Sequence, residues 1–347
     1  MNAPILTTRE LNRALLARQL LLERSSVPIP RALERVAGLQ TQYAPTGYIG
    51  VWSRLGDVRR DALTRALERR SVIQGTLMRG TIHMVSKRDY PWFAEAVRSA
   101  RRDWWMRATH QSSSRRAIEA AARRVRDALA DGPRRRADLL RELDMDSTTW
   151  NAVGMWVDLV RVPPSGTWEQ RRADLYALAD DWLDHAPDVS ERDAVELLVR
   201  RYLAAFGPAS RKDVATFAGL PLSTVTPALG RLTLRRFRDE RGDELLDVPR
   251  AALPDPDTPA PVRFLGTWEA PLLVHARRTQ ILPESLRPRV FNTKTPHSIS
   301  TFLVDGQVAG TWGFDRGAVQ VEPFVRLSSS ARREVIEESE RLAAFMS

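Results

Sequence analysis

The sequence predicts an α+β protein in which helices and short strands alternate, and three observations support this prediction. Residues 207–248 read as a helix, a turn, a second helix and a strand hairpin. Helices followed by paired strands occur twice before this segment, and residues 262–325 are rich in strand-forming residues. Helix, turn, helix and hairpin is the order of a winged helix, a fold used mainly to bind DNA. We therefore predict three tandem winged-helix units followed by a small, β-barrel-like C-terminal domain.

The first predicted unit covers residues 1–110 and begins with amphipathic helices, in which leucines and other apolar residues recur at helical spacing. Residues 71–86 then favour a pair of strands, because β-branched and apolar side chains dominate there and Gly75 and Gly80 interrupt the run. The three helices are predicted at about residues 8–24, 30–38 and 61–70.

The second predicted unit covers residues 111–187 and repeats this order. A strand at 159–162 is followed by a Pro-Pro-Ser-Gly turn and a return strand at 167–169, and residues 174–179 continue the edge. The helices of this unit are predicted at about residues 114–130, 134–143 and 147–157.

The third predicted unit covers residues 188–253 and contains the clearest local signals. A helix is expected at 191–206, and Ser210 is placed to cap the next helix, because its hydroxyl can accept from the free N–H groups of the first turn. Gly219 should end that helix, since glycine tolerates positive φ. A second short helix and a hairpin with a turn at 241–243 complete the unit.

The predicted C-terminal domain covers residues 262–347 and follows a proline-rich connection. Its strongest signal is the hairpin at 301–312, in which Asp305-Gly306 supplies a two-residue turn. The chain should end in a helix at about residues 328–345, where apolar residues form a stripe.

Composition points to an anionic partner. The 347-residue chain has a formal net charge of +10, and all but three of its basic residues are Arg, which matches phosphate and guanine edges. Without Cys, disulfides, thiolate catalysis and Cys-ligated zinc are excluded. No apolar run reaches the roughly 20 residues of a membrane span. We expect a cytoplasmic monomer that does not engage a membrane.

The common catalytic signatures are missing from the sequence. It has neither a Gly-rich phosphate loop, a dinucleotide fingerprint nor a nucleophile elbow, and its five His residues are scattered. We therefore predict no metal and no cofactor. On these features alone the sequence indicates a DNA-binding protein.

Two segments of the first unit indicate a catalytic activity in addition to DNA binding. They are Gly38-Leu-Gln-Thr-Gln-Tyr-Ala-Pro45 and Leu77-Met-Arg-Gly-Thr-Ile-His-Met-Val-Ser86. Together with the helix–turn–helix of the third unit and the segment 303–312, they resemble the AlkZ/YcaQ family of bacterial DNA glycosylases. The resemblance spans nearly the whole chain. It implies tandem winged helices and a C-terminal β-barrel.

The resemblance also implies an activity: hydrolysis of the N-glycosidic bond of a cationic alkylated purine, typically N7-alkylguanine, in double-stranded DNA. Gln40 and Gln42 match the Gln-x-Gln motif of one branch, which is associated with bulky natural-product adducts, interstrand crosslinks and antibiotic self-resistance. The other branch has Asp where this sequence has Gln42, so the resemblance implies no charged general base here.

The chemistry of two amides suits such a substrate. Pro45 disfavours a helical conformation at Ala44, so Gln40 and Gln42 are expected outside a helix, with side chains on one side of an extended segment. An amide can orient a water molecule but cannot accept its proton. This suffices when the base is already a good leaving group and the transition state resembles an oxocarbenium ion. Weak or no activity is expected on uncharged bases such as uracil.

Eight residues are predicted to contact DNA because they are polar or basic and lie near the Gln motif or at predicted helix starts. Arg79, Thr81 and His83 share strand parity and would line one face. Basic residues at the first turn of a helix would add to its attraction for phosphate. The eight are Arg79, Thr81, His83, Ser86, Arg134, Arg135, Arg211 and Lys212.

Two other functions fit parts of the sequence. A non-catalytic winged-helix DNA-binding protein or transcriptional regulator would explain the basic charge and the lack of strong acids and bases. A ligand-responsive regulator would use the C-terminal β domain to bind a small molecule. The Gln pair favours the glycosylase over both.

Overall fold

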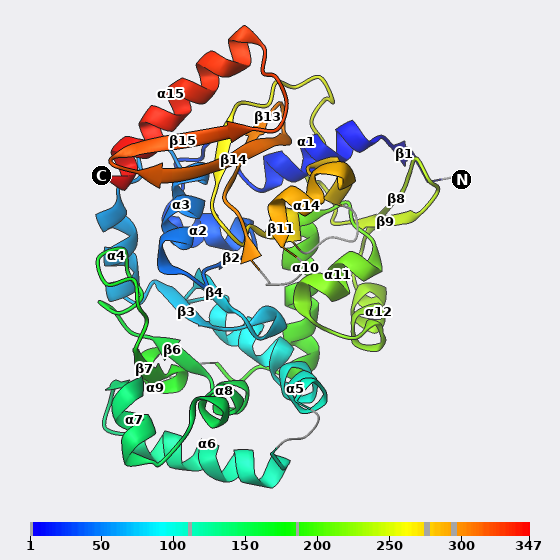
Figure 1. The fold of residues 1–347 in the computed structure, drawn as a ribbon. Coiled ribbons are helices and arrows are strands. Elements are labelled where there is room, and N and C mark those ends of the chain that lie inside the picture. Colours follow the sequence, from blue (N-terminus) through cyan, green and yellow to red (C-terminus); the bar gives the residue numbers. More distant parts are fainter. Residues whose placement is uncertain (1–2, 110–112, 185–186, 274–277, 293–296) are drawn as a thin grey trace.

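The computed structural model describes residues 3–109, 113–184, 187–273, 278–292 and 297–347. The C-terminal sheet and the last helix lie at one end of the molecule, and the helices of the predicted second unit lie at the other (Figure 1). A six-stranded sheet and a long central helix lie between them. Within these ranges, none of the helices has the length and apolar character needed to cross a membrane.

The N-terminal part is helical, as expected, up to the first strand pair. Thr7 caps the first helix by accepting from the N–H of Glu10, which returns a bond to Thr7 in a capping box. Two helices of the first predicted unit were not predicted: α3, in which every residue is buried, and α5 (Tyr90–Ala108). The elements are β1 (Ile5–Leu6), α1 (Thr8–Arg18), α2 (Ile29–Arg35), β2 (Leu39–Gln40), α3 (Ala44–Arg54) and α4 (Arg60–Glu68).

The six-stranded sheet joins the hairpins of the first and second predicted units. Its strand order is β2-β4-β3-β6-β7-β5, and the two hairpins meet where Gly75 pairs with Val160. A Cβ at Gly75 would lie 2.7 Å from the Tyr90 ring, so glycine permits this approach. The strands are β3 (Val72–Thr76), β4 (Ile82–Ser86), β5 (Arg134–Arg135), β6 (Leu159–Arg161) and β7 (Leu175–Leu178).

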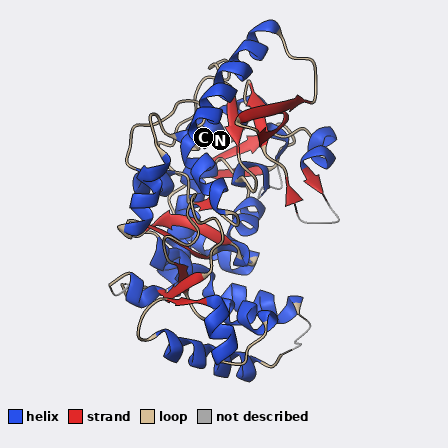
Figure 2. Ribbon diagram, turned by 60° about the vertical axis from the view of Figure 1, so that its left-hand side comes forward, coloured by secondary structure: helices blue, strands red, loops and turns tan. Residues whose placement is uncertain are grey.

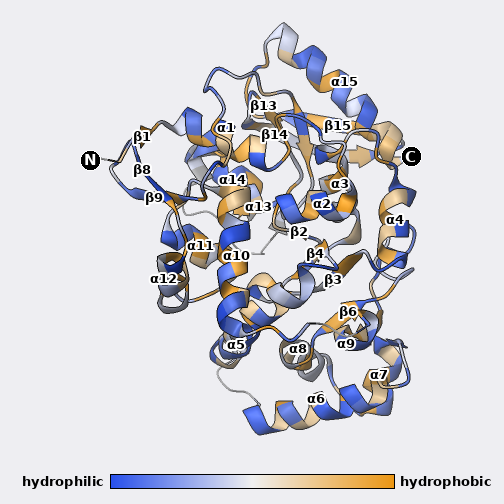
Figure 3. Ribbon diagram, turned by 180° about the vertical axis from the view of Figure 1, so that it is seen from behind, coloured by the Kyte–Doolittle hydropathy of each residue, from blue (hydrophilic) through white to orange (hydrophobic). Residues whose placement is uncertain are grey.

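Helices pack around this sheet, and Figure 2 shows its strands as a group separate from the C-terminal sheet. Hydrophilic and hydrophobic residues alternate along α6 in Figure 3, and its buried face includes Ile118, Val125 and Leu129. The predicted return strand at 167–169 is wrong, because the partner of β6 is β7. The helices here are α5 (Tyr90–Ala108), α6 (Arg115–Leu129), α7 (Arg136–Glu142), α8 (Ser147–Trp156) and α9 (Ala179–Trp182).

The local predictions for the third unit are confirmed. The helix at 191–206 has the expected bounds, Ser210 caps the next helix through the N–H of Asp213, and Gly219 ends it at φ 70°. A hairpin follows the second short helix. These elements are α10 (Glu191–Phe206), α11 (Arg211–Ala218), α12 (Leu222–Arg231), β8 (Arg235–Asp239) and β9 (Glu244–Asp247).

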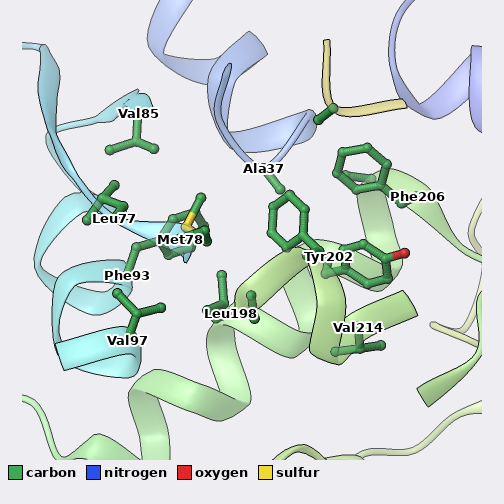
Figure 4. Close-up of a cluster of buried hydrophobic side chains, with 14 of the residues drawn as sticks. Ala37, Leu77, Met78, Val85, Phe93, Val97, Leu198, Tyr202, Phe206 and Val214 are labelled. Atoms are coloured by element: carbon green, nitrogen blue, oxygen red, sulfur yellow. The ribbon is translucent and has the colours of Figure 1, made fainter. Parts of the chain in front are cut away.

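A shared hydrophobic core holds the strand pair β3–β4 against the third unit. Leu77 and Met78, at the turn of the pair, lie beside Phe93 of α5 and face Leu198 and Tyr202 of α10 (Figure 4). All five side chains are buried. Burial of large apolar side chains is the main favourable term in folding, so this core fixes the position of the β3–β4 turn.

The C-terminal sheet is open, and the predicted β-barrel is wrong. Its order is β10-β13-β14-β15, so β10 and β15 are its two edges and do not pair with each other. Four strands are too few to close a barrel, and short helices lie at residues 270–273, 278–280 and 284–290, in a region predicted to be strand-rich. The terminal helix is confirmed. The main elements are β10 (Arg263–Leu265), β13 (Thr301–Val304), β14 (Gln307–Asp315), β15 (Ala318–Pro323) and α15 (Ser329–Met346).

The shorter elements of this region are two short strands that pair with each other, β11 and β12, and several helical turns. They lie between β10 and β13 in the chain. They are α13 (Ala270–Leu273), η2 (Arg278–Gln280), η3 (Glu284–Leu286), α14 (Arg287–Val290), β11 (Phe291–Asn292) and β12 (His297–Ser298).

The predicted turn of the C-terminal hairpin is confirmed and docks onto α1. Gly306 has φ 77°, and a Cβ there would lie 2.5 Å from Oδ1 of Asn12 and 2.6 Å from Leu16. Gly317, in the next hairpin, has φ 81° but no atom within 4 Å of its Cβ position.

Gly306→Ala should therefore destabilise the fold more than Gly317→Ala. Positive φ costs an L-residue about 1–2 kcal/mol at both sites. Crowding against α1 adds about 1–3 kcal/mol at Gly306 alone. Urea unfolding of the two variants measures the difference, and equal losses of unfolding free energy would rule out tight docking of the turn.

Candidate active site

The Gln40–Tyr43 segment lies at the edge of the six-stranded sheet, where β2 pairs with β4. Gln40 is opposite His83 in the antiparallel register, and the Thr41 N–H donates to the Ile82 carbonyl at 2.8 Å. The segment lies outside a helix, as predicted. Ala44, however, begins α3, and Pro45 lies in its first turn, where a proline without an N–H is well tolerated.

Both Gln amides are held by the turn between β3 and β4. Oε1 of Gln40 accepts from Nη2 of Arg79 at 2.8 Å, and Oε1 of Gln42 accepts from the Ile82 N–H at 3.1 Å. Because both partners can only donate, the amide orientation is fixed at each Gln. Each amide keeps an NH2 group and a second oxygen lone pair for a water molecule. Gln40 is 7% exposed, whereas Gln42 is exposed.

Arg79 links this motif to the third predicted unit. Its backbone has φ 57°, and its guanidinium donates to Gln40 and to the Phe217 carbonyl at the end of α11, while lying 5.8 Å from the Phe217 ring. Burial lowers the pKa of Arg79 to about 10, so the side chain stays charged at neutral pH. A positive charge therefore lies directly against the Gln40 amide.

His83 is buried and uncharged at neutral pH. Burial, together with the nearby charge of Arg79, lowers the pKa of its imidazole to about 3. Its Nδ1 lies 3.1 Å from the Thr81 carbonyl, so Nδ1 carries the proton and donates. Ser86 is 2% exposed and its hydroxyl accepts from the Asp89 N–H. Burial argues against direct DNA contact by His83 and Ser86, whereas Thr81 is partly exposed.

The predicted basic contacts at helix starts have carboxylate partners nearby. Arg134 pairs with Glu142, and Arg135 pairs with Asp174 at 2.6 Å. These two residues form β5 and precede α7, so they are not in its first turn as predicted. Both ion pairs lie at the surface, where such pairs are weak, so DNA contact by Arg134 and Arg135 stays a prediction.

In the third unit the two residues predicted to contact DNA, Arg211 and Lys212, differ in their surroundings. Arg211 pairs with Glu244 at 2.8 Å, whereas Lys212 is exposed. Both residues lie in the first turn of α11, as predicted.

Two arginines that the sequence did not indicate contact the motif. Arg161 donates to the Thr41 carbonyl at 3.3 Å, and Arg171 donates to the Tyr43 hydroxyl at 3.1 Å. They lie more than 100 residues further along the chain, on β6 and in the loop before β7. No local pattern could have linked them to the motif.

A pocket of about 260 Å³ adjoins the motif at Tyr43. Its lining includes Trp168, Arg171, Trp312 and Phe314, so aromatic faces and one guanidinium surround it. A larger pocket of about 640 Å³ lies between α4 and the end of α15 and is lined by none of the predicted site residues.

No group of three or more potential metal ligands occurs in the described parts of the chain. His110, His185 and His275 lie outside those parts.

Comparison with known proteins places this fold in a family. A family model described as "DNA glycosylase AlkZ-like" matches residues 33–345. The solved structure of the Streptomyces sahachiroi DNA glycosylase AlkZ is similar in fold, with a TM-score of 0.81, 18% sequence identity, and coverage of 99% of this chain and 97% of that one. The curated proteins give no match to this sequence. Because the family model matches most of this chain, the chain belongs to the AlkZ-like family of DNA glycosylases.

Proposed function

We propose that this DNA glycosylase hydrolyses the N-glycosidic bond of cationic alkylated purines, N7-alkylguanine above all, in double-stranded DNA. Gln40 and Gln42 are the proposed catalytic residues. The observation that supports this most is that one turn, residues 79–82, fixes both amides by donating to their oxygens. Two oriented neutral amides can position a water molecule, and they supply no strong base.

The proposed reaction follows from the charge of the substrate. The C1′–N9 electrons pass to a base that is already cationic, which departs neutral, while the oxygen of water bonds to C1′ and its proton passes to solvent. The sugar resembles an oxocarbenium ion in the transition state. The remaining lone pairs of the amide oxygens, which carry partial negative charge, stabilise that cation and hold the water.

A neutral site limits the enzyme to activated substrates. Gln42 cannot take a proton, and the nearest imidazole, His83, is neutral and buried. An uncharged base such as uracil needs protonation or a strong nucleophile to leave. We therefore expect little or no uracil excision.

Bulky adducts fit the exposed half of the motif. Gln42 and Tyr43 lie at the surface, so a lesion approaching them does not have to enter a closed pocket. On this basis the proposed substrates include natural-product adducts and interstrand crosslinks, in base excision repair or antibiotic self-resistance. We propose a cytoplasmic monomer.

We propose that the chain is organised in four parts. Three winged-helix units cover residues 1–110, 111–187 and 188–253, and the C-terminal β domain covers residues 262–347. The first boundary falls at residues outside the described ranges. The hairpins of the first two units belong to one continuous six-stranded sheet, so these two units are joined through their strands.

We also propose that the enzyme is monofunctional. A lyase step needs an amine that attacks C1′. In the described chain, Lys87 forms an ion pair with Asp184 and Lys212 lies at the start of α11, so neither contacts Gln40 or Gln42.

The experiment that tests this function uses two duplexes that differ in one base. One carries N7-methylguanine and the other carries uracil, and alkali with mild heating cleaves any abasic site. The protein should cut the first duplex and leave the second intact. Efficient excision of uracil, or none of N7-methylguanine, would refute the proposed substrate class.

A further inference from the structure

Three arginines from distant parts of the chain contact neighbouring residues of the Gln motif. Arg79 donates to the Gln40 side chain, Arg161 to the Thr41 carbonyl, and Arg171 to the Tyr43 hydroxyl. Each comes from a different place: the β3–β4 turn, strand β6 and the loop before β7. The fold therefore concentrates positive charge on one short segment.

Within the described residues, none of the three arginines forms an ion pair. Burial lowers the pKa of both Arg79 and Arg161, and no carboxylate raises the pKa of either. Fully buried arginines elsewhere are paired, such as Arg54 with Glu269 at 2.8 Å. Unpaired buried charge is costly.

The exposed member of the group is Arg171. Its Nη1 donates to Tyr43 and its Nε to the Trp168 carbonyl at 3.4 Å, while the guanidinium lies 5.3 Å from the Trp168 ring. These contacts hold the planar group in place beside the pocket and leave Nη2 for another acceptor. A fixed guanidinium with a free edge suits a phosphate oxygen.

We propose that Arg79, Arg161 and Arg171 form a phosphate-binding site for the DNA strand that passes over the Gln motif, with Arg171 in direct contact with a phosphate. This inference rests on the proposed function, since it assumes that the motif acts on DNA. Arg79 and Arg161 hold the motif and raise the positive potential over it. The missing counter-charge is the phosphate itself.

The site differs from the basic positions that the sequence indicated. Arg134, Arg135 and Arg211 each form an ion pair with a carboxylate, so replacing one of these arginines breaks that ion pair. Among the described residues, Arg171 has no carboxylate partner that would have to be displaced when DNA binds. Its replacement should remove one DNA phosphate contact, and each such contact steepens the dependence of affinity on salt.

Arg171→Gln and Arg333→Gln make a matched test, because both arginines are exposed and both substitutions remove one charge, and Arg333 lies near the start of α15, outside the predicted DNA contacts. Binding of each variant to an unmodified duplex is followed by fluorescence anisotropy over a salt series. Arg171→Gln should lower the slope of log K against log salt by about 1, and Arg171→Lys should restore most of it. Arg333→Gln should leave the slope unchanged.

Two outcomes would overturn the proposal: an unchanged slope for Arg171→Gln, or the same reduction for Arg333→Gln. Excision of N7-methylguanine at saturating enzyme separates this result from the proposed function. If the wild type binds with the predicted slopes but excises nothing, the function fails and the phosphate site stands. If it excises normally while Arg171→Gln binds unchanged, only the phosphate site fails.

Discussion

Replacing Gln40 and Gln42 together by Ala is expected to lower the single-turnover rate of N7-methylguanine excision by about 100- to 1,000-fold. Loss of one preorganised group that stabilises transition-state charge typically has an effect of this size. Both amides are fixed by donors from one turn, so their positions are set before DNA binds. The rate is measured with enzyme in excess over labelled duplex.

Gln320→Ala is the control for this double variant, because Gln320 is exposed on β15 and belongs to the C-terminal sheet, not to the six-stranded sheet that carries the motif. It should excise at the wild-type rate. Duplex affinity should be similar for all three proteins, since the amides carry no charge. Wild-type excision by the double variant would show that the catalytic groups lie elsewhere.

Arg79→Met should reduce excision by about 10- to 100-fold while the protein remains folded. The substitution keeps an unbranched side chain but removes the donor to Gln40 and the charge beside it. Gln40 could then rotate, and misplacement of a positioning group by about 1 Å is enough for a loss of about 100-fold. The Phe217 carbonyl also loses its partner, at a cost of about 1–3 kcal/mol.

Arg102→Met separates the local effect from a general loss of stability. Arg102 is also partly buried and donates to a backbone carbonyl, that of Trp156, at 3.0 Å. The two variants should lose similar unfolding free energy, measured by urea, but only Arg79→Met should lose most of its activity. Equal activities would exclude Arg79 from positioning Gln40.

Features set by neighbouring residues could be predicted from the sequence. Ser210 and Gly219 bound their helix because a hydroxyl cap and a positive φ act within one turn. The Asp305-Gly306 turn was predictable for the same reason. The pairing of Gly75 with Val160, which merges two hairpins, depends on residues 85 apart in the chain and has no local signal.

Helix α3 shows how burial conceals a helix. Every residue from Ala44 to Arg54 is buried, so the polar face that marks an amphipathic helix is absent. Two glycines and a proline in this segment also lower its intrinsic helix propensity. Tertiary packing decides its conformation.

The site was predictable in its motif but not in its surroundings. Gln40 lies outside a helix, as the sequence indicated, and it contacts Arg79, another predicted site residue. Strand parity predicted one polar strand face for Arg79, Thr81 and His83, which is wrong. Arg79 lies in the β3–β4 turn, and β2 and β3 flank β4 and bury the His83 imidazole. Arg161 and Arg171 enter only through the fold.

The pH dependence of excision tests most directly whether the two amides position water without accepting a proton. His83 has a pKa of about 3 and Arg79 one of about 10, so neither changes charge between pH 5.5 and 8. The single-turnover rate on N7-methylguanine, at saturating enzyme, should therefore be flat across this range. A rate that rises about tenfold per pH unit and then levels would reveal a titrating general base and contradict the account.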